Sequence, residues 1–300
     1  MGYKLQLRGI LPAMLTPFTA DGSAIDTEAL AAHTKYLVDA GVGGLIPGGS
    51  TGEFSSLSHD ERKLLHETVI DAAEGRVTVI AQTGALTAAE AIELSQHAEK
   101  AGAAAVMVVP PFYDELSFAE LKAYYTEVAA AINIPVMLYH IPAVTGQSAT
   151  AEQIAELGDI PGVESVKDSG GNAAELSAEL LVHGNRIQVA NGWDHLTFLG
   201  LCTGAQSSVW GAANIFPKQA VELYEAIAVR SDLKAGREIW TKLYPLVLFL
   251  ESASYTTRVK AATKLTGRNV GEPRKPFLPV PAEDVETLKG LLVDAGIDVA

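Results

Sequence analysis

Residues 77–110, VTVIAQTGALTAAEAIELSQHAEKAGAAAVMVVP, contain one complete copy of a pattern that decides the fold. A short apolar run (77–84) is followed by a helical pattern (88–102) and by a second apolar run (104–110). Neither run alternates cleanly between apolar and polar residues, as is typical of parallel strands that are covered on both faces. The segment therefore predicts a strand, a helix and a second, parallel strand.

The same order of apolar run and helical pattern occurs eight times. The eight runs are GILPAMLTPF (9–18), GGLIPGG (43–49), VTVIAQTG (77–84), AAVMVVP (104–110), IPVMLYH (134–140), VESVK (163–167), IQVANG (187–192) and QSSVWGAAN (206–214). Eight consecutive units of this size predict an α/β fold, a (β/α)8 TIM barrel in residues 1–230. A doubly wound open sheet is the alternative, but it usually has a Gly-rich phosphate turn after its first strand, where this chain has TPFTADGS (16–23).

The last part of the chain has a different pattern. Three helical segments (233–252, 254–267 and 282–296) follow one another without a strand, and a proline-rich connector (271–281) precedes the last. We expect residues 231–300 to form a C-terminal three-helix extension that belongs to the same domain as the barrel.

The composition excludes several classes of protein. The net charge of −14 over 300 residues, without clusters of Lys and Arg, argues against binding to nucleic acid. Cys202 is the only cysteine, so neither a disulfide framework nor a thiolate metal site is expected, and we expect its side chain to be packed in the core. No apolar stretch reaches the length of a bilayer, which leads us to expect a cytoplasmic protein without a membrane partner.

Lys167 is the first candidate for chemistry, because it ends the strand in VESVKDSGGN (163–172). A lysine at a strand end is commonly a solvated charge. An internal strand of a barrel, however, has no exposed edge, and burial disfavours the ammonium form and leaves an amine that can attack a carbonyl. We therefore interpret Lys167 as a functional residue.

Other candidates follow the same reasoning, because reactive groups of a barrel gather at the carboxyl ends of its strands. Tyr113 and Tyr139 follow the fourth and fifth strands, and their hydroxyl groups can transfer protons. The run Gly49–Ser50–Thr51 follows the second strand and can bind a carboxylate or phosphate, or can simply be a capped turn. Asp194 and His195 follow the seventh strand and either cap the next helix or contact a substrate.

Three motifs in order resemble one family, the dihydrodipicolinate synthase/N-acetylneuraminate lyase family of pyruvate-type class I aldolases. They are GGSTGEFSSLSHDER (48–62), YHIPAVTG (139–146) and SVKDSGGN (165–172), and the two ends of the chain are similar as well. The resemblance implies a barrel with a three-helix extension, a homotetramer, and neither a metal nor an organic cofactor. It also implies that pyruvate, or the pyruvate part of a 2-oxo acid, is the substrate.

Residue roles come from the resemblance position by position. Lys167 is similar to the lysine that forms the imine, and Tyr139 to the tyrosine of the proton relay, with Ser50 as its partner. Tyr113 is similar to a tyrosine that a neighbouring subunit inserts. Ser50 and Thr51, with the backbone of Gly49, are similar to the carboxylate clamp.

The second half of the predicted site departs from both well-known members. The synthases have an arginine where this chain has Val144, and the sialic acid lyases have an acidic residue and a serine where it has His195 and Gly211. Asp194 alone matches the lyases, and we expect it to accept a substrate hydroxyl group, with help from Thr145.

Four hypotheses follow. The first is a Schiff-base lyase, aldolase or dehydratase that acts on a 2-oxo acid such as a 2-keto-3-deoxy sugar acid. The second is 4-hydroxy-tetrahydrodipicolinate synthase, which Val144 disfavours because valine cannot bind the second carboxylate. The third is N-acetylneuraminate lyase. The fourth is a barrel that binds a 2-oxo acid without catalysis, which would not need the tyrosine relay.

Overall fold

The computed structural model describes residues 4–300 and contains eight parallel strands in the order β1-β8-β7-β6-β5-β4-β3-β2. The strands are β1 (Gly9–Pro12), β2 (Gly44–Leu45), β3 (Thr78–Gln82), β4 (Ala105–Val108), β5 (Val136–His140), β6 (Val163–Asp168), β7 (Gln188–Asn191) and β8 (Ser207–Trp210). Seven of them lie within the predicted runs and β6 extends one residue beyond its run, to Asp168, so the (β/α)8 barrel is confirmed.

The sheet closes between its first and last members, β1 and β2. The backbone amide of Ile46 donates to the carbonyl of Pro12 (3.0 Å), and the amide of Met14 donates to the carbonyl of Ile46 (2.9 Å). These bonds lie just beyond the short strand β2 and bring the end of β1 beside the loop that starts at Pro47. The carboxyl ends of the strands therefore surround one space.

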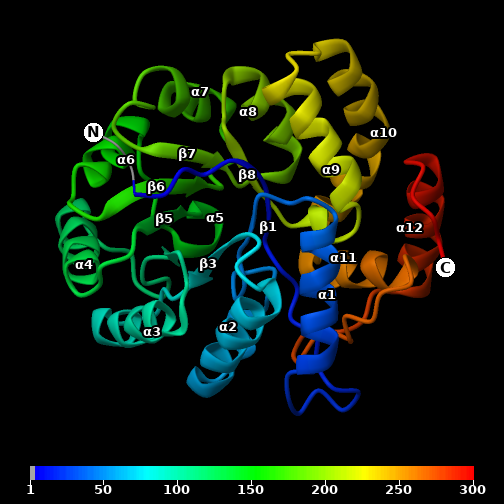
Figure 1. The fold of residues 1–300 in the computed structure, drawn as a ribbon, viewed down its shortest axis with the longest axis horizontal. Coiled ribbons are helices and arrows are strands. Elements are labelled where there is room, and N and C mark those ends of the chain that lie inside the picture. The colour runs from blue at the N-terminus through cyan, green and yellow to red at the C-terminus, as the bar shows by residue number, and fades with distance from the viewer. Residues whose placement is uncertain (1–3) are drawn as a thin grey trace.

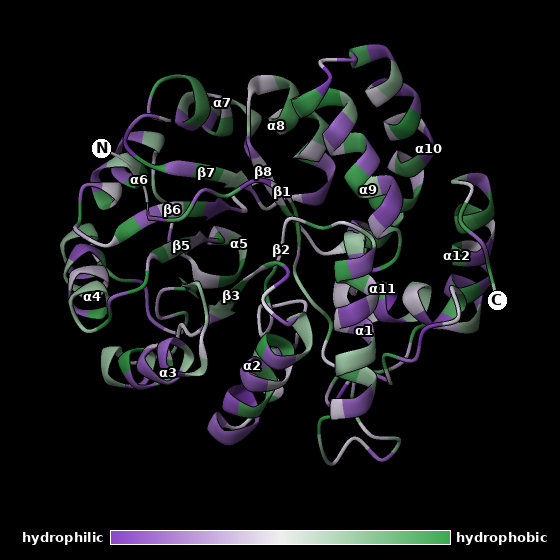
Figure 2. Cartoon of the chain, in the orientation of Figure 1, coloured by the Kyte–Doolittle hydropathy of each residue, from purple (hydrophilic) through white to green (hydrophobic). Residues whose placement is uncertain are grey.

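Helices surround the barrel (Figure 1). They are α1 (Thr27–Asp39), α2 (His59–Ala73), α3 (Ala88–Ala101), α4 (Phe118–Ala130), α5 (Pro142–Thr145), α6 (Ala151–Gly158), α7 (Ala173–Leu181), α8 (Thr197–Thr203), α9 (Pro217–Tyr224), α10 (Leu233–Ser252), α11 (Tyr255–Leu265) and α12 (Ala282–Asp294). Side chains at the helix starts satisfy free backbone amides: Ser58, for example, forms a capping box with Glu61. In Figure 2 these helices carry both hydrophobic and hydrophilic residues, as helices with one buried face do.

The extension packs against the β8 side of the barrel, on the right flank of Figure 1. One hydrophobic cluster joins Trp210 of β8 and Phe216 to Leu246 of α10, Val259 of α11 and Leu288 of α12. Since α10 and α11 lie beside the end of β8, their residues can reach the mouth of the barrel.

One expectation about the core is wrong. Cys202 is exposed on α8 rather than packed in the core, because the buried residues of that short helix are Thr197, Gly200 and Leu201.

No helix within residues 4–300 combines the length and apolar character needed to cross a membrane.

Candidate active site

Lys167 and Tyr139 lie side by side inside the barrel. They are register partners on β6 and β5, and their side chains are only 4% and 3% exposed. The Lys167 ammonium nitrogen, Nζ, lies 4.0 Å from the centre of the Tyr139 ring. Alternation along the two strands puts both side chains on the inner face, which is why a lysine at this strand end is buried.

The glycine after β7 gives Lys167 its space. A Cβ atom on Gly192 would lie 2.6 Å from Cγ and 2.8 Å from Cε of Lys167, far closer than such atoms approach. A larger residue at position 192 would therefore displace the lysine side chain.

Lys167 faces a cavity of about 290 Å3. Seven segments contribute to its wall, which consists of Ala13, Ser50, Thr51, Tyr139, Ile141, Ala143, Val144, Lys167, Ser169, Gly192, Trp193, Asp194, Val209, Gly211, Glu251, Tyr255 and Thr256. The predicted residues Ser50, Thr51, Tyr139, Val144, Lys167, Asp194 and Gly211 thus lie around one space. An amine, two tyrosine hydroxyl groups and the hydroxyl groups of the 50–51 pair are accessible from it.

Ser50 and Tyr139 are in hydrogen-bond contact. Their hydroxyl oxygens are 3.4 Å apart, and either group can donate. The neighbouring backbone is held by the Thr16 hydroxyl group, which donates to the carbonyl of Gly52 (2.7 Å). The contact gives a proton two adjacent oxygen atoms between which it can move.

Glu53 holds the end of the loop that carries Ser50 and Thr51. Its backbone is left-handed (φ 58°), and its buried carboxylate lies 2.6 Å from Nζ of Lys260 on α11. The other carboxylate oxygen accepts a hydrogen bond from the backbone amide of Arg274 (2.8 Å). The extension thereby anchors the loop that carries Ser50 and Thr51.

The residues that follow Tyr139 and Lys167, His140 and Asp168, are not part of the cavity wall, because successive side chains of a strand alternate between its faces. His140 Nδ1 lies 2.7 Å from the Asp168 carboxylate, and His140 Nε2 accepts a hydrogen bond from the amide of Ala149. Glu179 of α7 is buried nearby, and this burial, with the negative charge of Asp168, raises its pKa to about 9. These groups form a polar layer behind the two cavity residues.

Asp194 lines the cavity, but its carboxylate already has partners. It accepts hydrogen bonds from the amides of Ala212 (3.1 Å) and Gly211 (3.4 Å) and from the hydroxyl group of Tyr255. Burial raises the pKa of Asp194 to about 6, although these three donors act against the rise. The carboxylate holds the end of β8 and the start of α11 together, and a substrate hydroxyl group would have to compete with three donors.

Four other predicted residues are not part of the cavity wall formed by residues 4–300: Gly49, Tyr113, Thr145 and His195. Tyr113 is 87% exposed. The Thr145 hydroxyl group donates to the carbonyl of Ile141 within α5 (3.1 Å), so it is turned away from a substrate. His195 contacts the wall indirectly, because its Nδ1 pairs with Glu251.

Sequence reasoning missed the contribution of the extension. Glu251 lies at the end of α10, and Tyr255 and Thr256 lie at the start of α11, yet all three line the cavity. Gly211 is explained by the same helix: a side chain at position 211 would collide with the ring of Tyr255. A serine at this position would therefore require the Tyr255 side chain to shift.

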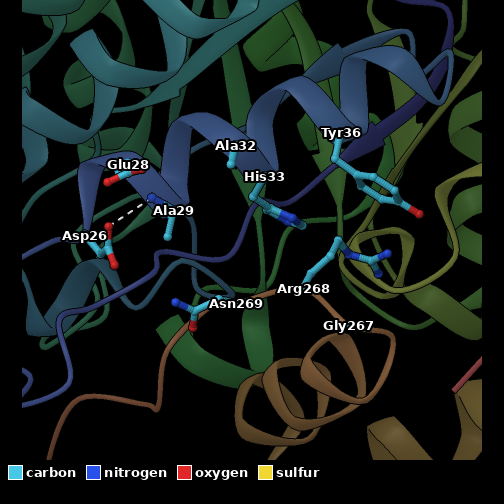
Figure 3. A pocket seen from close by; sticks show the side chains of 9 residues that line it. All are labelled: Asp26, Glu28, Ala29, Ala32, His33, Tyr36, Gly267, Arg268 and Asn269. Atoms are coloured by element: carbon cyan, nitrogen blue, oxygen red, sulfur yellow. Dashed lines mark hydrogen bonds between the residues drawn. The ribbon is translucent and has the colours of Figure 1, made fainter. Parts of the chain in front are cut away.

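A second hollow, of about 430 Å3, lies between α1 and the segment after α11 (Figure 3). It shares no wall residue with the cavity at Lys167. Its cation, Arg268, lies over the ring of Tyr36 and donates to the carbonyls of Asn214 and Ile215. These contacts give Arg268 a structural role.

Comparison with known proteins identifies the family. The model of the dihydrodipicolinate synthetase family matches residues 6–295. The chain belongs to this family. It is therefore a lyase of class I, which uses pyruvate-type chemistry through a lysine Schiff base.

Individual relatives match over nearly the whole chain. The 4-hydroxy-tetrahydrodipicolinate synthase of Methanocaldococcus jannaschii is 35% identical over 97% of this chain and 99% of its own. The structure of YagE from Escherichia coli K12, in complex with pyruvate, is 33% identical with a TM-score of 0.93, over 98% of this chain and 100% of its own. A monomeric dihydrodipicolinate synthase variant is 29% identical with a TM-score of 0.92, over 97% of both chains.

Proposed function

We propose that this family member is a Schiff-base lyase or aldolase for a 2-oxo acid with a neutral hydroxylated tail, such as a 2-keto-3-deoxy sugar acid. One observation supports this proposal above the others. The cavity that contains the unpaired amine of Lys167 and the Tyr139–Ser50 pair has Val144, Asp194 and Glu251 in its wall, and no arginine among residues 4–300. The wall thus suits an imine at one end and hydroxyl groups at the other.

Formation of the imine requires Lys167 and the clamp. The amine attacks the C2 carbonyl of the substrate, a carbinolamine forms, and water leaves as the protonated imine is made. Tyr139 supplies and removes the protons in these steps, and Ser50 passes them on. Ser50 and Thr51, with their backbone amides, bind the C1 carboxylate.

Cleavage follows from the charge of the imine. The protonated nitrogen withdraws electrons, so the C3–C4 bond breaks as the C4 hydroxyl proton passes to Tyr139, and an aldehyde and an enamine form. Protonation of the enamine at C3 and hydrolysis of the imine release pyruvate and free Lys167. Loss of the C4 hydroxyl group as water from the same imine is the dehydratase alternative.

A panel of substrates tests the proposal. The protein is incubated with 2-keto-3-deoxy acids of different chain length and with sialic acid, and pyruvate release is measured. We expect release from at least one neutral-tailed acid. Absence of both pyruvate release and a borohydride-trapped pyruvate adduct would overturn the proposal and favour a binding protein without catalysis.

The names of the relatives favour a second candidate, 4-hydroxy-tetrahydrodipicolinate synthase. Condensation of pyruvate with aspartate semialdehyde needs a group that binds a second carboxylate. Val144 provides no charge, and the neighbouring Asp194 and Glu251 are acidic. A higher kcat/KM for aspartate semialdehyde than for neutral aldehydes would establish the synthase instead.

We further propose that the active form is a homotetramer in which Tyr113 completes the relay of a neighbouring subunit. The exposure of Tyr113, outside its own cavity, supports this. Size-exclusion chromatography with light scattering measures the oligomeric state. Restored activity on mixing Tyr113→Phe with Lys167→Ala protein would support exchange of the tyrosine, and a fully active monomer would contradict it.

A further inference from the structure

The extension places an acidic residue, Glu251, in the wall of the cavity, although Glu251 lies outside the sequence motifs that supply Ser50, Tyr139 and Lys167. Glu251 lies in the last turn of α10, and its side chain is 15% exposed. Tyr255 and Thr256 from α11 line the same part of the wall. A substrate tail that extends past the reacting carbons meets residues of the extension.

Two contacts hold the Glu251 carboxylate in a fixed position. One oxygen, Oε1, accepts a hydrogen bond from the backbone amide of Asp194 (3.0 Å), and the other contacts Nδ1 of His195. His195 Nε2 accepts a hydrogen bond from the indole N–H of Trp193 (2.7 Å), so its proton lies on Nδ1 and is directed to Glu251. Trp193, His195 and Glu251 thus form a connected chain along the wall.

The remaining hydrogen-bonding capacity of this chain is on Glu251. Asp194 uses its carboxylate for two amides and the Tyr255 hydroxyl group, whereas Oε1 of Glu251 accepts one hydrogen bond, from the Asp194 amide, and can accept another. Burial and the nearby Asp194 charge raise the pKa of Glu251 to about 8. The carboxyl group can therefore accept from a hydroxyl group as an anion or donate to one when it is protonated.

Charge decides which tails the wall accepts. Lys167 is the cation of the cavity wall in residues 4–300, and the imine uses its nitrogen. Above pH 8, where Glu251 as well as Asp194 is ionised, a second carboxylate on the substrate would lie beside two negative charges without a cation to bind it, and like charges at short distance disfavour binding. A hydroxyl group is uncharged and is not repelled by these carboxylates.

We propose that Glu251 is the specificity-determining residue of this site: its carboxylate, fixed by His195 and the Asp194 amide, binds a hydroxyl group of the aldehyde half and repels a second carboxylate. The inference rests on the proposed function and assigns to Glu251 the selection that sequence reasoning assigned to Asp194. The resulting substrate class is a 2-oxo acid with one carboxylate and a polyhydroxy tail.

The test uses the full-length protein with Glu251→Gln and a matched control, Glu238→Gln, which makes the same change at an exposed position of α10. Condensation of pyruvate is measured at pH 9, where the Glu251 carboxylate is ionised, with D-erythrose, a neutral hydroxy aldehyde, and with succinic semialdehyde, an acidic one. We expect the ratio of kcat/KM, neutral over acidic, to fall by about 10–150-fold in Glu251→Gln, the range for a hydrogen bond to a charged group. The control should keep the ratio of the unmutated protein.

Borohydride trapping with pyruvate separates the two levels of the proposal. Normal trapping on Lys167 with an unchanged ratio in Glu251→Gln overturns the role of Glu251 and leaves the lyase function intact. Failure of trapping in the unmutated protein overturns the function itself. Should Glu251→Gln fail to fold, Glu251→Asp keeps the charge and must keep the rejection of succinic semialdehyde, and a preference of the unmutated protein for the acidic aldehyde also overturns the inference.

Discussion

Two buried lysines, Lys167 and Lys260, show how one residue type serves two purposes in this molecule. Lys260 is 1% exposed, pairs with the Glu53 carboxylate and donates to the carbonyl of Glu272 (3.1 Å). Lys167 is 4% exposed but belongs to none of the ion pairs formed by residues 4–300, and its nitrogen lies over the face of Tyr139. The paired lysine is fixed as a structural cation, whereas the unpaired one is free to react.

The buried acids repeat the contrast. Glu53 has a lysine and a backbone amide as partners, whereas neither carboxylate oxygen of Glu179 has a hydrogen-bond partner within the described part of the chain. Burying a charge without a partner is energetically unfavourable. The group therefore becomes neutral through a shift of its pKa, or it is retained because it has a function. Pairing, rather than burial, therefore distinguishes structural from reactive groups here.

The largest expected effect comes from Lys167→Ala, which we predict abolishes turnover while the protein remains folded. The substitution removes the amine that forms the imine, and the other buried lysine, Lys260, is held by Glu53. Mass spectrometry after borohydride reduction with pyruvate should place the adduct on Lys167 of the unmutated protein. An adduct on Lys260 would erase the contrast between the two lysines.

Tyr139→Phe tests the group that lies against the unpaired lysine. We expect pyruvate to bind still, and kcat to fall by about 10²–10⁴-fold, because the substitution removes an acid–base group. Tyr125→Phe is the matched control, since the Tyr125 hydroxyl group donates to the carbonyl of Val108 (3.0 Å) and Tyr125 is not part of the cavity wall. Activity of Tyr139→Phe within a few-fold of the control would exclude Tyr139 from the relay.

Lys260→Met tests the paired lysine through stability. The substitution leaves the Glu53 carboxylate buried without its cation, so we expect the free energy of unfolding to fall by about 3–5 kcal/mol. Urea denaturation measures the change, and Lys242→Met, at an exposed position of α10, is the control. The double variant Glu53→Gln/Lys260→Met should lose less; an equal loss would show that the charge pair is not the cause.

Val144→Arg adds a mobile cation at the mouth of the cavity, where valine is exposed. A charge-assisted hydrogen bond contributes roughly 1.5–3 kcal/mol, so we expect kcat/KM for aspartate semialdehyde to rise by about 10–150-fold. The measurement compares this aldehyde with neutral hydroxy aldehydes before and after the substitution. No rise would mean that Asp194 and Glu251 dominate the charge of the cavity.

Glu179→Gln tests the unpaired acid and has the smallest effect. Burial raises the pKa of Glu179 from 4.5 to about 9, so the folded protein binds more protons than the unfolded chain between these values and loses stability as the pH rises through them. We expect Glu179→Gln to gain stability relative to the unmutated protein by up to about 1.4 kcal/mol for each pH unit between 6 and 8. The exposed Glu127→Gln should show no such trend; an equal trend there would refute the assignment.

The sequence predicts the barrel and half of the cavity well, because both depend on local patterns. A strand that ends in Tyr139 or Lys167 is recognised from its own residues, and the closed barrel then brings the strand ends together. The other half of the cavity depends on how helices pack. Tyr255 donates to Asp194 from 61 residues away, and no local pattern in α10 or α11 distinguishes Glu251 from an ordinary surface acid. The exposure of Cys202 was missed for the same reason, since it depends on which side of a short helix faces outward.

The anchor of the Ser50–Thr51 loop also sets an order of events during protein synthesis. The backbone amide that donates a hydrogen bond to the Glu53 carboxylate belongs to Arg274, which is 221 residues further along the chain. At translation rates of about 5–20 residues per second, the loop waits roughly 10–40 s for this partner after it has left the ribosome. The eight strands and Lys167, the proposed nucleophile, are complete by then, but the proposed clamp for the carboxylate is not. If these roles hold, a nascent chain carries its nucleophile well before it can hold a substrate against it, and it becomes competent only as its last helices dock.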